Sequence, residues 1–183
     1  MDAKECIMTR RSVRSFTSDP VHQSDIEQIL ELAKYAPSWK NSQTVRYTLI
    51  LDSELKREIR EISDNCLMDF KFNQGIVNYA PAIVVLSTVK SISGFEKDGR
   101  FSTSKGTHWE SFDAGIAAQT FCLAAHENGF GTVIMGVYDE GKVSKAVNIP
   151  ENQSVSALIA IGRPAKEANP PARLAVSDLL TVK

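Results

Sequence analysis

The stretch WESFDAGIAAQTFCLAAHEN, residues 109–128, predicts the element around which the fold is built. Apolar or small side chains occupy most faces of the helix that it would form, and Gly129 follows as a common helix-ending residue. A helix that is apolar on most sides belongs at the centre of a protein. Its small side chains would admit a second helix at close range, either within one chain or across a dimer. These small residues are Ala114, Gly115, Ala117, Ala118, Ala124 and Ala125.

The flanking segments predict strands and further helices. Runs of β-branched and apolar residues at 45–51, 82–87, 132–138 and 154–162 are typical of strands, and the second reads as buried on both faces. Helices are expected at 53–64 and 140–147. A capping box, with Ser24 at the N-cap and Glu27 at N3, predicts another helix that runs up to Pro37.

Two segments lack such periodicity. Residues 88–108 are rich in Ser, Gly, Lys and Asp, which predicts a long surface loop or lid. From Arg163 onward, Pro164, Pro170 and Pro171 prevent a continuous helix and predict an extended C-terminal arm over 163–183. The whole chain, 1–183, is expected to be a single domain.

Composition excludes several classes of protein. With 183 residues, 43% of them hydrophobic, and a net charge of −1, the chain is typical of soluble globular proteins and has no field that would hold a nucleic acid. Its apolar runs are shorter than the about 18 residues of a membrane span, and no leader pattern opens it, so a cytoplasmic protein is expected. The cysteines Cys6, Cys66 and Cys122 and the three histidines lack disulfide or metal-ligand spacing.

Familiar catalytic signatures are also missing. The GFG at 129–131 follows a predicted helix and precedes a strand, which inverts the order of a dinucleotide-binding turn. The sequence carries neither a Walker motif nor a GxSxG nucleophile elbow.

The stretch RRSVRSF, residues 10–16, places three arginines within five positions. If the first helix continued through it, Arg10 and Arg14 would share one face. Such a cluster repels itself unless an anion lies there, and guanidinium groups with the Ser12 hydroxyl suit a phosphate. The alternative is a solvated basic turn, or salt bridges to acidic residues of the next helix.

A second polar cluster is APSWKNSQ, residues 36–43, which follows the end of a predicted helix. Its dense donors and acceptors suit a planar polar ligand. An ordinary loop chosen for its turn residues explains the same composition.

Taken together, RRSVRSF, APSWKNSQ, the stretch DAGIAAQTFCLAAHENGFGTVIMG at 113–136 and AIGRP at 160–164 resemble, in that order, the nitroreductase family of FMN-dependent oxidoreductases. The resemblance covers nearly the whole chain and is to the compact members. It implies an α+β fold with a central mixed β-sheet surrounded by helices. It also implies an intertwined homodimer with FMN at the subunit interface.

The resemblance assigns site residues position by position. Arg10 and Ser12 are implied to bind the FMN phosphate and Arg14 the N1/C2 edge of the ring, while the backbone at 134–136 faces N5. The motif at 36–43 is implied to reach the flavin from the partner subunit. The full implied FMN set is Arg10, Arg11, Ser12, Arg14, Pro37, Ser38, Asn41, Asn73, Ile134, Met135, Gly136, Arg163 and Arg173.

Two positions depart from the family pattern. Met135 stands where relatives often carry Glu, and Pro171 stands where they often carry a basic residue that helps Arg173 bind the phosphate. These departures put the hydrogen bonding near N5 and the positive charge of the phosphate site in question.

The chemistry implied by the resemblance resides in the cofactor, so no catalytic side chain and no metal is expected. NADH or NADPH would pass hydride to flavin N5, and a nitroaromatic, quinone or similar small acceptor would then take it in a ping-pong cycle. Trp39 and Lys40 are expected to line the acceptor pocket together with the 88–108 loop. Alternatives are other flavin chemistry, such as reductive dehalogenation or flavin fragmentation, and a non-enzymatic FMN-binding protein.

Overall fold

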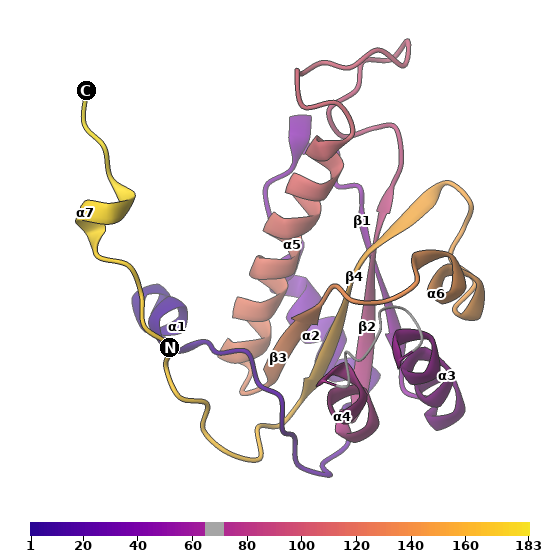
Figure 1. Cartoon of the computed structure of the whole chain (residues 1–183), viewed down its shortest axis with the longest axis vertical. Helices are drawn as coiled ribbons and strands as arrows, with labels where there is room; N and C mark the ends of the chain where they lie inside the picture. The colour runs from indigo at the N-terminus through magenta and orange to yellow at the C-terminus, as the bar shows by residue number, and fades with distance from the viewer. Residues whose placement is uncertain (65–71) are drawn as a thin grey trace.

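The computed structural model describes residues 1–64 and 72–183 (Figure 1). The helices are α1 (Ala3–Thr9), α2 (Gln23–Ala33), the 3-10 turn η1 (Trp39–Asn41), α3 (Ser53–Asp64), α4 (Phe72–Tyr79), α5 (His108–Glu127), α6 (Glu140–Ala146) and α7 (Val176–Leu179). The strands are β1 (Val45–Ile50), β2 (Ala82–Val89), β3 (Gly131–Met135) and β4 (Gln153–Gly162). Among the described helices, none is both long enough and apolar enough to cross a membrane.

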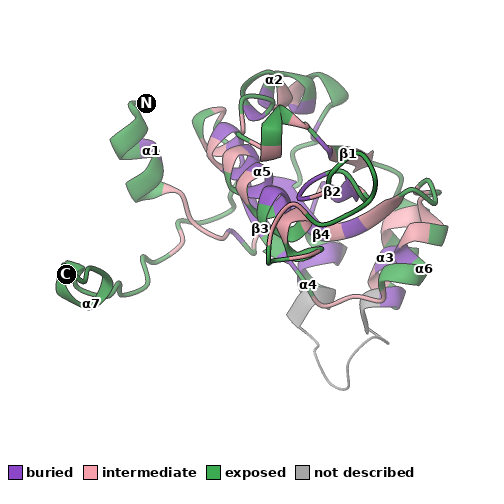
Figure 2. Ribbon diagram, turned by 90° about the horizontal axis from the view of Figure 1, so that it is seen from above, coloured by how far each residue is buried: buried purple, intermediate pink, exposed green. Residues whose placement is uncertain are grey.

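The four strands form one sheet in the order β1-β2-β4-β3, and every neighbouring pair is antiparallel. Helices α2 and α5 cover one face of the sheet, and α3, α4 and α6 cover the other (Figures 1 and 2). The chain is therefore a three-layer α+β structure, as expected.

Burial on both faces explains the composition of β2. Ala82, Val84 and Leu86 point into the layer of α2 and α5, whereas Ile83 and Val85 point toward α3, α4 and α6. Because successive side chains of a strand alternate between faces, a strand covered on both sides must be apolar throughout. The sequence AIVVL, residues 82–86, meets that requirement.

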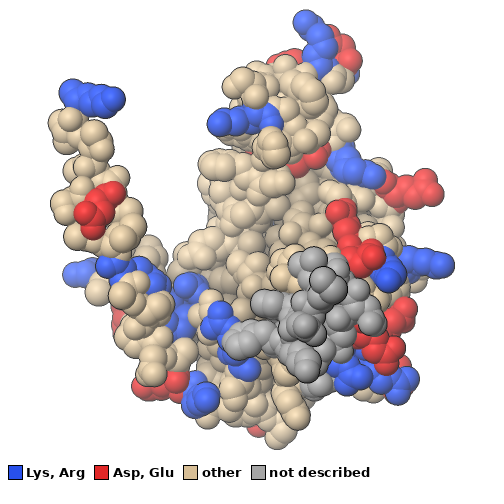
Figure 3. Space-filling model, viewed as in Figure 1, with Lys and Arg blue, Asp and Glu red and all other residues tan. Residues whose placement is uncertain are grey.

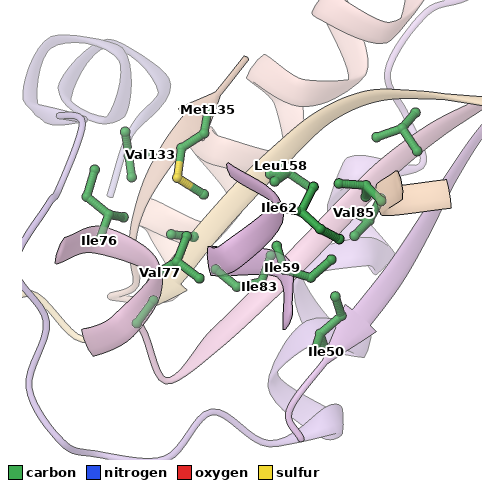
Figure 4. Close-up of a cluster of buried hydrophobic side chains, with 14 of the residues drawn as sticks. Ile50, Ile59, Ile62, Ile76, Val77, Ile83, Val85, Val133, Met135 and Leu158 are labelled. Atoms are coloured by element: carbon green, nitrogen blue, oxygen red, sulfur yellow. The ribbon is translucent and has the colours of Figure 1, made fainter. Parts of the chain in front are cut away.

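The core between the sheet and α3, α4 and α6 consists mainly of branched aliphatic side chains from all three helices and all four strands (Figure 4). Its labelled members are Ile50, Ile59, Ile62, Ile76, Val77, Ile83, Val85, Val133, Met135 and Leu158. This core fixes β3 at one edge of the sheet, where the chain continues into the candidate site.

The small residues of α5 pack inside the chain. Ala114, Ala118, Ala124 and Ala125 lie with Phe121 in the core formed by α2, α5 and the sheet. Gly115 is the member of the small set that lies exposed. Close packing against α2 and the sheet therefore accounts for most of these small residues without a second helix from another chain.

The predicted strands and the long helix are confirmed, with their ends shifted by a few residues. Helix α2 begins two residues earlier than its motif predicted, so the assignment of Ser24 as N-cap was wrong. The Oδ2 atom of Asp25 accepts from the backbone N–H of His22 at 2.8 Å, which makes His22 the N-cap. The arm over 163–183 is exposed and carries the short helix α7 (Figure 2).

The first helix does not continue through RRSVRSF. Helix α1 ends at Thr9, and Arg10, with φ −56° and ψ 131°, leads into an extended segment. Ser12 forms a parallel bridge with Thr132, and the Val13 N–H donates to the Thr132 carbonyl at 2.9 Å. The predicted helical face shared by Arg10 and Arg14 is thus wrong. The four named strands pair antiparallel, and this isolated parallel bridge lies outside them.

Gly131 permits the close approach of this segment to β3. A Cβ atom at Gly131 would lie 2.6 Å from Cγ2 of Val13, well inside van der Waals contact. Glycine at this position therefore lets the extended segment lie directly on the edge strand.

We predict that Gly131→Ala lowers the free energy of unfolding by about 1–3 kcal/mol, because the added methyl group overpacks the contact with Val13. Gly141→Ala in α6 is the matched control, since its Cβ would meet only Asp139 Oδ1 at 3.6 Å. That control should be neutral or stabilising by about 0.5–1 kcal/mol. Chemical denaturation of both variants measures the difference, and equal stabilities would contradict the packing argument.

Candidate basic groove and polar turn

A basic groove lies where the extended N-terminal segment, the end of α5 and the start of the arm meet. It encloses about 680 Å³. Its polar and charged lining residues are Thr9, Arg10, Arg11, His126, Thr132, Lys166 and Glu167. Lys and Arg side chains gather around the lower end of the hollow between the arm and the rest of the molecule (Figure 3).

The arginines of RRSVRSF reach this region in different ways. Arg10 and Arg11 are half-buried and line the groove. The Nη1 atom of Arg11 donates to the carbonyls of Met8 and Arg10, at 2.6 and 2.9 Å, and so closes the end of α1. Arg14 is exposed and donates to the Ser12 carbonyl at 3.2 Å. The structure therefore brings Arg10 and Arg11 together at one groove, with Ser12 and Arg14 next in the chain.

His126 is a wall residue of the groove that sequence reasoning missed. The Thr9 hydroxyl donates to the Glu5 carbonyl at 2.7 Å, so the 2.8 Å contact between Thr9 Oγ1 and His126 Nε2 has the ring nitrogen as donor. Burial, followed by the charges of Arg10 and Arg11, lowers the pKa of His126 against the opposing effect of Glu127. A lone histidine on a helix gave no signal, because Thr9 lies 117 positions away in the sequence.

Arg163 contacts the residues that follow the C-terminal end of α5. Its guanidinium lies 3.9 Å from the centre of the Phe130 ring and donates to the Asn128 carbonyl at 2.9 Å. A Cβ atom at Gly129, where φ is +76°, would lie 2.7 Å from Arg163 Nη1. These contacts give Arg163 a structural role, and its contact with a phosphate stays a prediction. Arg173 lies exposed on the arm and donates to the Pro171 and Ala172 carbonyls.

The second predicted cluster forms a tight polar turn around η1. The Ser38 hydroxyl accepts from the Gln43 N–H at 2.9 Å, and the Ser38 carbonyl accepts from the Asn41 N–H at 3.0 Å. Lys40, Asn41 and Gln43 adopt positive φ angles of 47°, 54° and 49°. Left-handed conformations at non-glycine residues are unfavourable, persist only where other contacts hold them, and gather at functional sites. This turn, residues 37–43, is called the polar turn below.

Trp39 packs against the start of α5, and Lys40 contacts the 88–108 loop. The Trp39 and Trp109 rings meet edge to face, with centroids 5.0 Å apart. Lys40 Nζ lies 3.3 Å from Glu96 Oε1 and 5.4 Å from the centre of the Trp39 ring. Hydrogen bonding from Ser102, and then from Lys40, lowers the pKa of the Glu96 carboxyl. The structure therefore joins Trp39 to α5 and Lys40 to the 88–108 loop.

The remaining predicted residues lie on β3 and α4. Ile134 is 46% exposed, whereas Met135 is buried in the core beside Val133. Gly136 is exposed, and a Cβ atom there would meet nothing within 4 Å. The side chain of Asn73 lies outside the described residues.

The two clusters line different hollows of one chain. Pro37 and Ser38 border a smaller pocket of about 160 Å³ with Asp113, whereas Arg10 and Arg11 border the basic groove. In the described part of the chain, no group of three or more His, Cys, Asp or Glu side chains is placed to hold a metal ion. The groove offers guanidinium donors suited to an anion, and the polar turn offers amide and hydroxyl groups suited to a planar ligand.

Comparisons with known proteins show similarity over most of the chain. The sequence profile of the nitroreductase family matches residues 7–163. The chain is 28% identical to an NADH dehydrogenase of Thermus thermophilus over 95% of its own length and 92% of the relative's. It is also 28% identical to an FMN reductase [NAD(P)H] of Bacillus subtilis, over 90% of this chain and 66% of that protein.

A solved structure supports the fold. The protein from Exiguobacterium sibiricum that was crystallised in complex with FMN superimposes with a TM-score of 0.83. The match covers 100% of this chain and 98% of the other, at 23% sequence identity.

We predict that His126 makes the protein sensitive to acid when the groove holds no anion. A histidine whose pKa is lowered on folding contributes stability above its unfolded pKa of about 6.5, and that stability is lost as the pH falls below this value. His126→Gln should therefore lose less thermal stability than wild type between pH 7 and pH 5. Melting curves in a phosphate-free buffer measure this, with the exposed His108→Gln as control. Parallel pH profiles for wild type and His126→Gln would contradict the prediction.

Proposed function

Because this chain belongs to the nitroreductase family, we propose that it is an FMN-dependent oxidoreductase that transfers hydride from NAD(P)H to a nitroaromatic, quinone or similar acceptor. The observation that carries the proposal is the basic groove, which Arg10 and Arg11 line where the extended segment lies on β3. The relatives named as an NADH dehydrogenase and an FMN reductase support both the donor and the cofactor.

The residues around the groove fit the phosphate of FMN. Guanidinium groups form forked, charge-assisted hydrogen bonds that match a phosphate better than a single ammonium does. Arg10 and Ser12 are proposed to bind the phosphate, with Arg11, Arg173 and the helper Arg163 adding positive charge. The same groove contains Glu167, whose negative charge opposes anion binding in part.

When bound, FMN supplies hydride transfer at N5, first from NAD(P)H and then to the acceptor, which gives a ping-pong cycle. The residues of the chain would position the flavin ring and stabilise negative charge on it. Arg14 is proposed to lie at the N1/C2 edge of the ring and to favour negative charge there, with Asn73 at the pyrimidine edge. The backbone of Ile134, Met135 and Gly136 is proposed to face N5.

The proposed assembly is a homodimer. Five apolar side chains of the arm are between 62% and 84% exposed in the single chain. They are Leu174, Val176, Leu179, Leu180 and Val182. Exposed apolar side chains gathered on one segment mark an interaction surface, and a second copy would cover them. In that dimer Pro37, Ser38 and Asn41 are proposed to reach the flavin of the partner subunit. A cytoplasmic location stays a prediction from the sequence.

We expect FMN-reconstituted protein, freed of unbound flavin, to show visible flavin absorption that bleaches on anaerobic addition of NADH or NADPH. Reoxidation by a nitroaromatic, a quinone or a halogenated aromatic then identifies the acceptor class. Flavin bands that persist with both nucleotides would instead support a binding protein. Absence of retained flavin would overturn the cofactor assignment.

We predict that Arg10→Ala weakens FMN binding by about 10- to 100-fold, which corresponds to the loss of one or two charge-assisted hydrogen bonds. Riboflavin, which lacks the phosphate, should bind wild type and Arg10→Ala equally well. Flavin fluorescence titration measures both affinities. Arg57→Ala is the matched control, because Arg57 is exposed on α3 and pairs with Glu54. An equal loss of FMN and riboflavin affinity would place the role of Arg10 elsewhere than at the phosphate.

A further inference from the structure

Asp113 is a buried carboxylate that joins two distant segments. It is 2% exposed and lies in the first half of α5. Its Oδ2 atom accepts from the backbone N–H of Trp39 at 2.9 Å and from the Ser93 hydroxyl at 2.5 Å. These partners lie 74 and 20 positions away in the sequence, one in the polar turn and one in the 88–108 loop.

Residues of α5 next to Asp113 also contact the 88–108 loop and the polar turn. Glu110 Oε1 accepts from the Ser91 N–H at 2.5 Å. A Cβ atom at Gly94 would lie 2.7 Å from Trp109 Cβ, so the loop backbone lies directly on α5. The Trp39 ring of the polar turn also packs on the Trp109 ring of α5.

The helix itself does not account for a carboxylate at this position. Asp113 lies beyond the first turn of α5, which begins at His108, so the helix dipole stabilises its charge little. A buried carboxylate is unfavourable unless hydrogen bonds compensate the lost hydration. The hydrogen bonds from Trp39 and Ser93 therefore compensate the buried Asp113 carboxylate for its lost hydration.

The polar turn that Asp113 holds has a strained backbone. The bond to the Trp39 N–H lies at the start of η1, immediately before the left-handed Lys40 and Asn41. Such conformations persist only when the surroundings hold them. Asp113 supplies a fixed acceptor for this purpose from a rigid helix.

We propose that Asp113 is a positioning residue, which sets the polar turn for contact with FMN and the acceptor by tying Trp39 to α5 and to Ser93 of the 88–108 loop. This inference rests on the proposed function, because it assumes that residues 37–41 contact the flavin. It extends that function by naming a residue that is proposed to contact neither cofactor nor substrate, but to hold in position the residues that contact them.

The chain provides a readout of this link that is independent of flavin. It contains two tryptophans, Trp39 and Trp109, and their rings are 5.0 Å apart. All tryptophan fluorescence therefore comes from this pair, and coupling between the two indoles contributes to the circular dichroism. Both are measured on the flavin-free protein.

Three variants and one control test the proposal. Asp113→Ala removes both bonds, Ser93→Ala removes one, and Asp113→Asn keeps a carbonyl oxygen that can accept from Trp39. The control is Asp139→Asn, since Asp139 accepts from the Lys142 N–H at 3.0 Å at the start of α6, away from the polar turn.

We expect Asp113→Ala to shift the tryptophan emission to longer wavelength and to abolish the coupled dichroism signal. FMN affinity should fall and the KM for the acceptor should rise, each by about tenfold, as for one lost charge-assisted hydrogen bond. Ser93→Ala should lie between Asp113→Ala and wild type, Asp113→Asn should recover most of both effects, and Asp139→Asn should match wild type.

Each contrary result has a distinct meaning. Unchanged tryptophan signals in Asp113→Ala, or in Ser93→Ala and Asp113→Asn if the alanine variant fails to fold, would show that the carboxylate does not hold the turn. Changed signals with unchanged FMN affinity and acceptor KM would make Asp113 structural only, and would overturn the positioning role while leaving the proposed function intact. A wild-type protein that binds no FMN would overturn the proposed function itself.

Discussion

The burial of β2 and β4 on both faces is the constraint on which the rest of the structure depends. Both strands lie inside the sheet, between α2 and α5 on one side and α3, α4 and α6 on the other. Aliphatic side chains fill both layers, so neither face of these strands offers room for a polar ligand. The two polar clusters of the candidate site accordingly lie at the edge of the sheet by β3 and beside the first half of α5.

Helix α5 consequently contributes residues to both the basic groove and the contacts of the polar turn. Its C-terminal end carries His126 and receives Arg163, whereas its N-terminal half carries Asp113 and holds the polar turn. At a rise of 1.5 Å per residue, Asp113 and His126 are about 20 Å apart along the helix axis. A rigid element keeps the basic groove and the polar turn apart within one chain. If both clusters contact one flavin, they meet most simply across two copies, which agrees with the exposed arm.

Local patterns predicted the elements well, because strands and helices of this chain follow from short-range periodicity. The continuous apolar run of β2 and the apolar helix 109–128 could be recognised without knowledge of distant residues. The errors and omissions share the opposite property. Arg10 leaves the helix because the following backbone pairs with Thr132 of β3, and the interactions of His126 and Asp113 span 117 and 74 positions. The family motifs singled out Arg10 and Ser38, which the structure places at two pockets, but they gave no indication of which helix residues hold them.

The small residues of α5 show how one sequence signal admits two physical explanations. Ala114, Ala118 and Ala125 were compatible with a helix from another subunit, yet they pack against α2 and the sheet of the same chain. The argument for a second copy therefore rests on the arm, where apolar side chains remain uncovered after folding. Removing that apolar surface from water favours association at roughly 25 cal/mol per Å² before the losses of binding entropy. A segment without its own core gains order only by packing on another surface, so the arm and the flavin site are expected to form together.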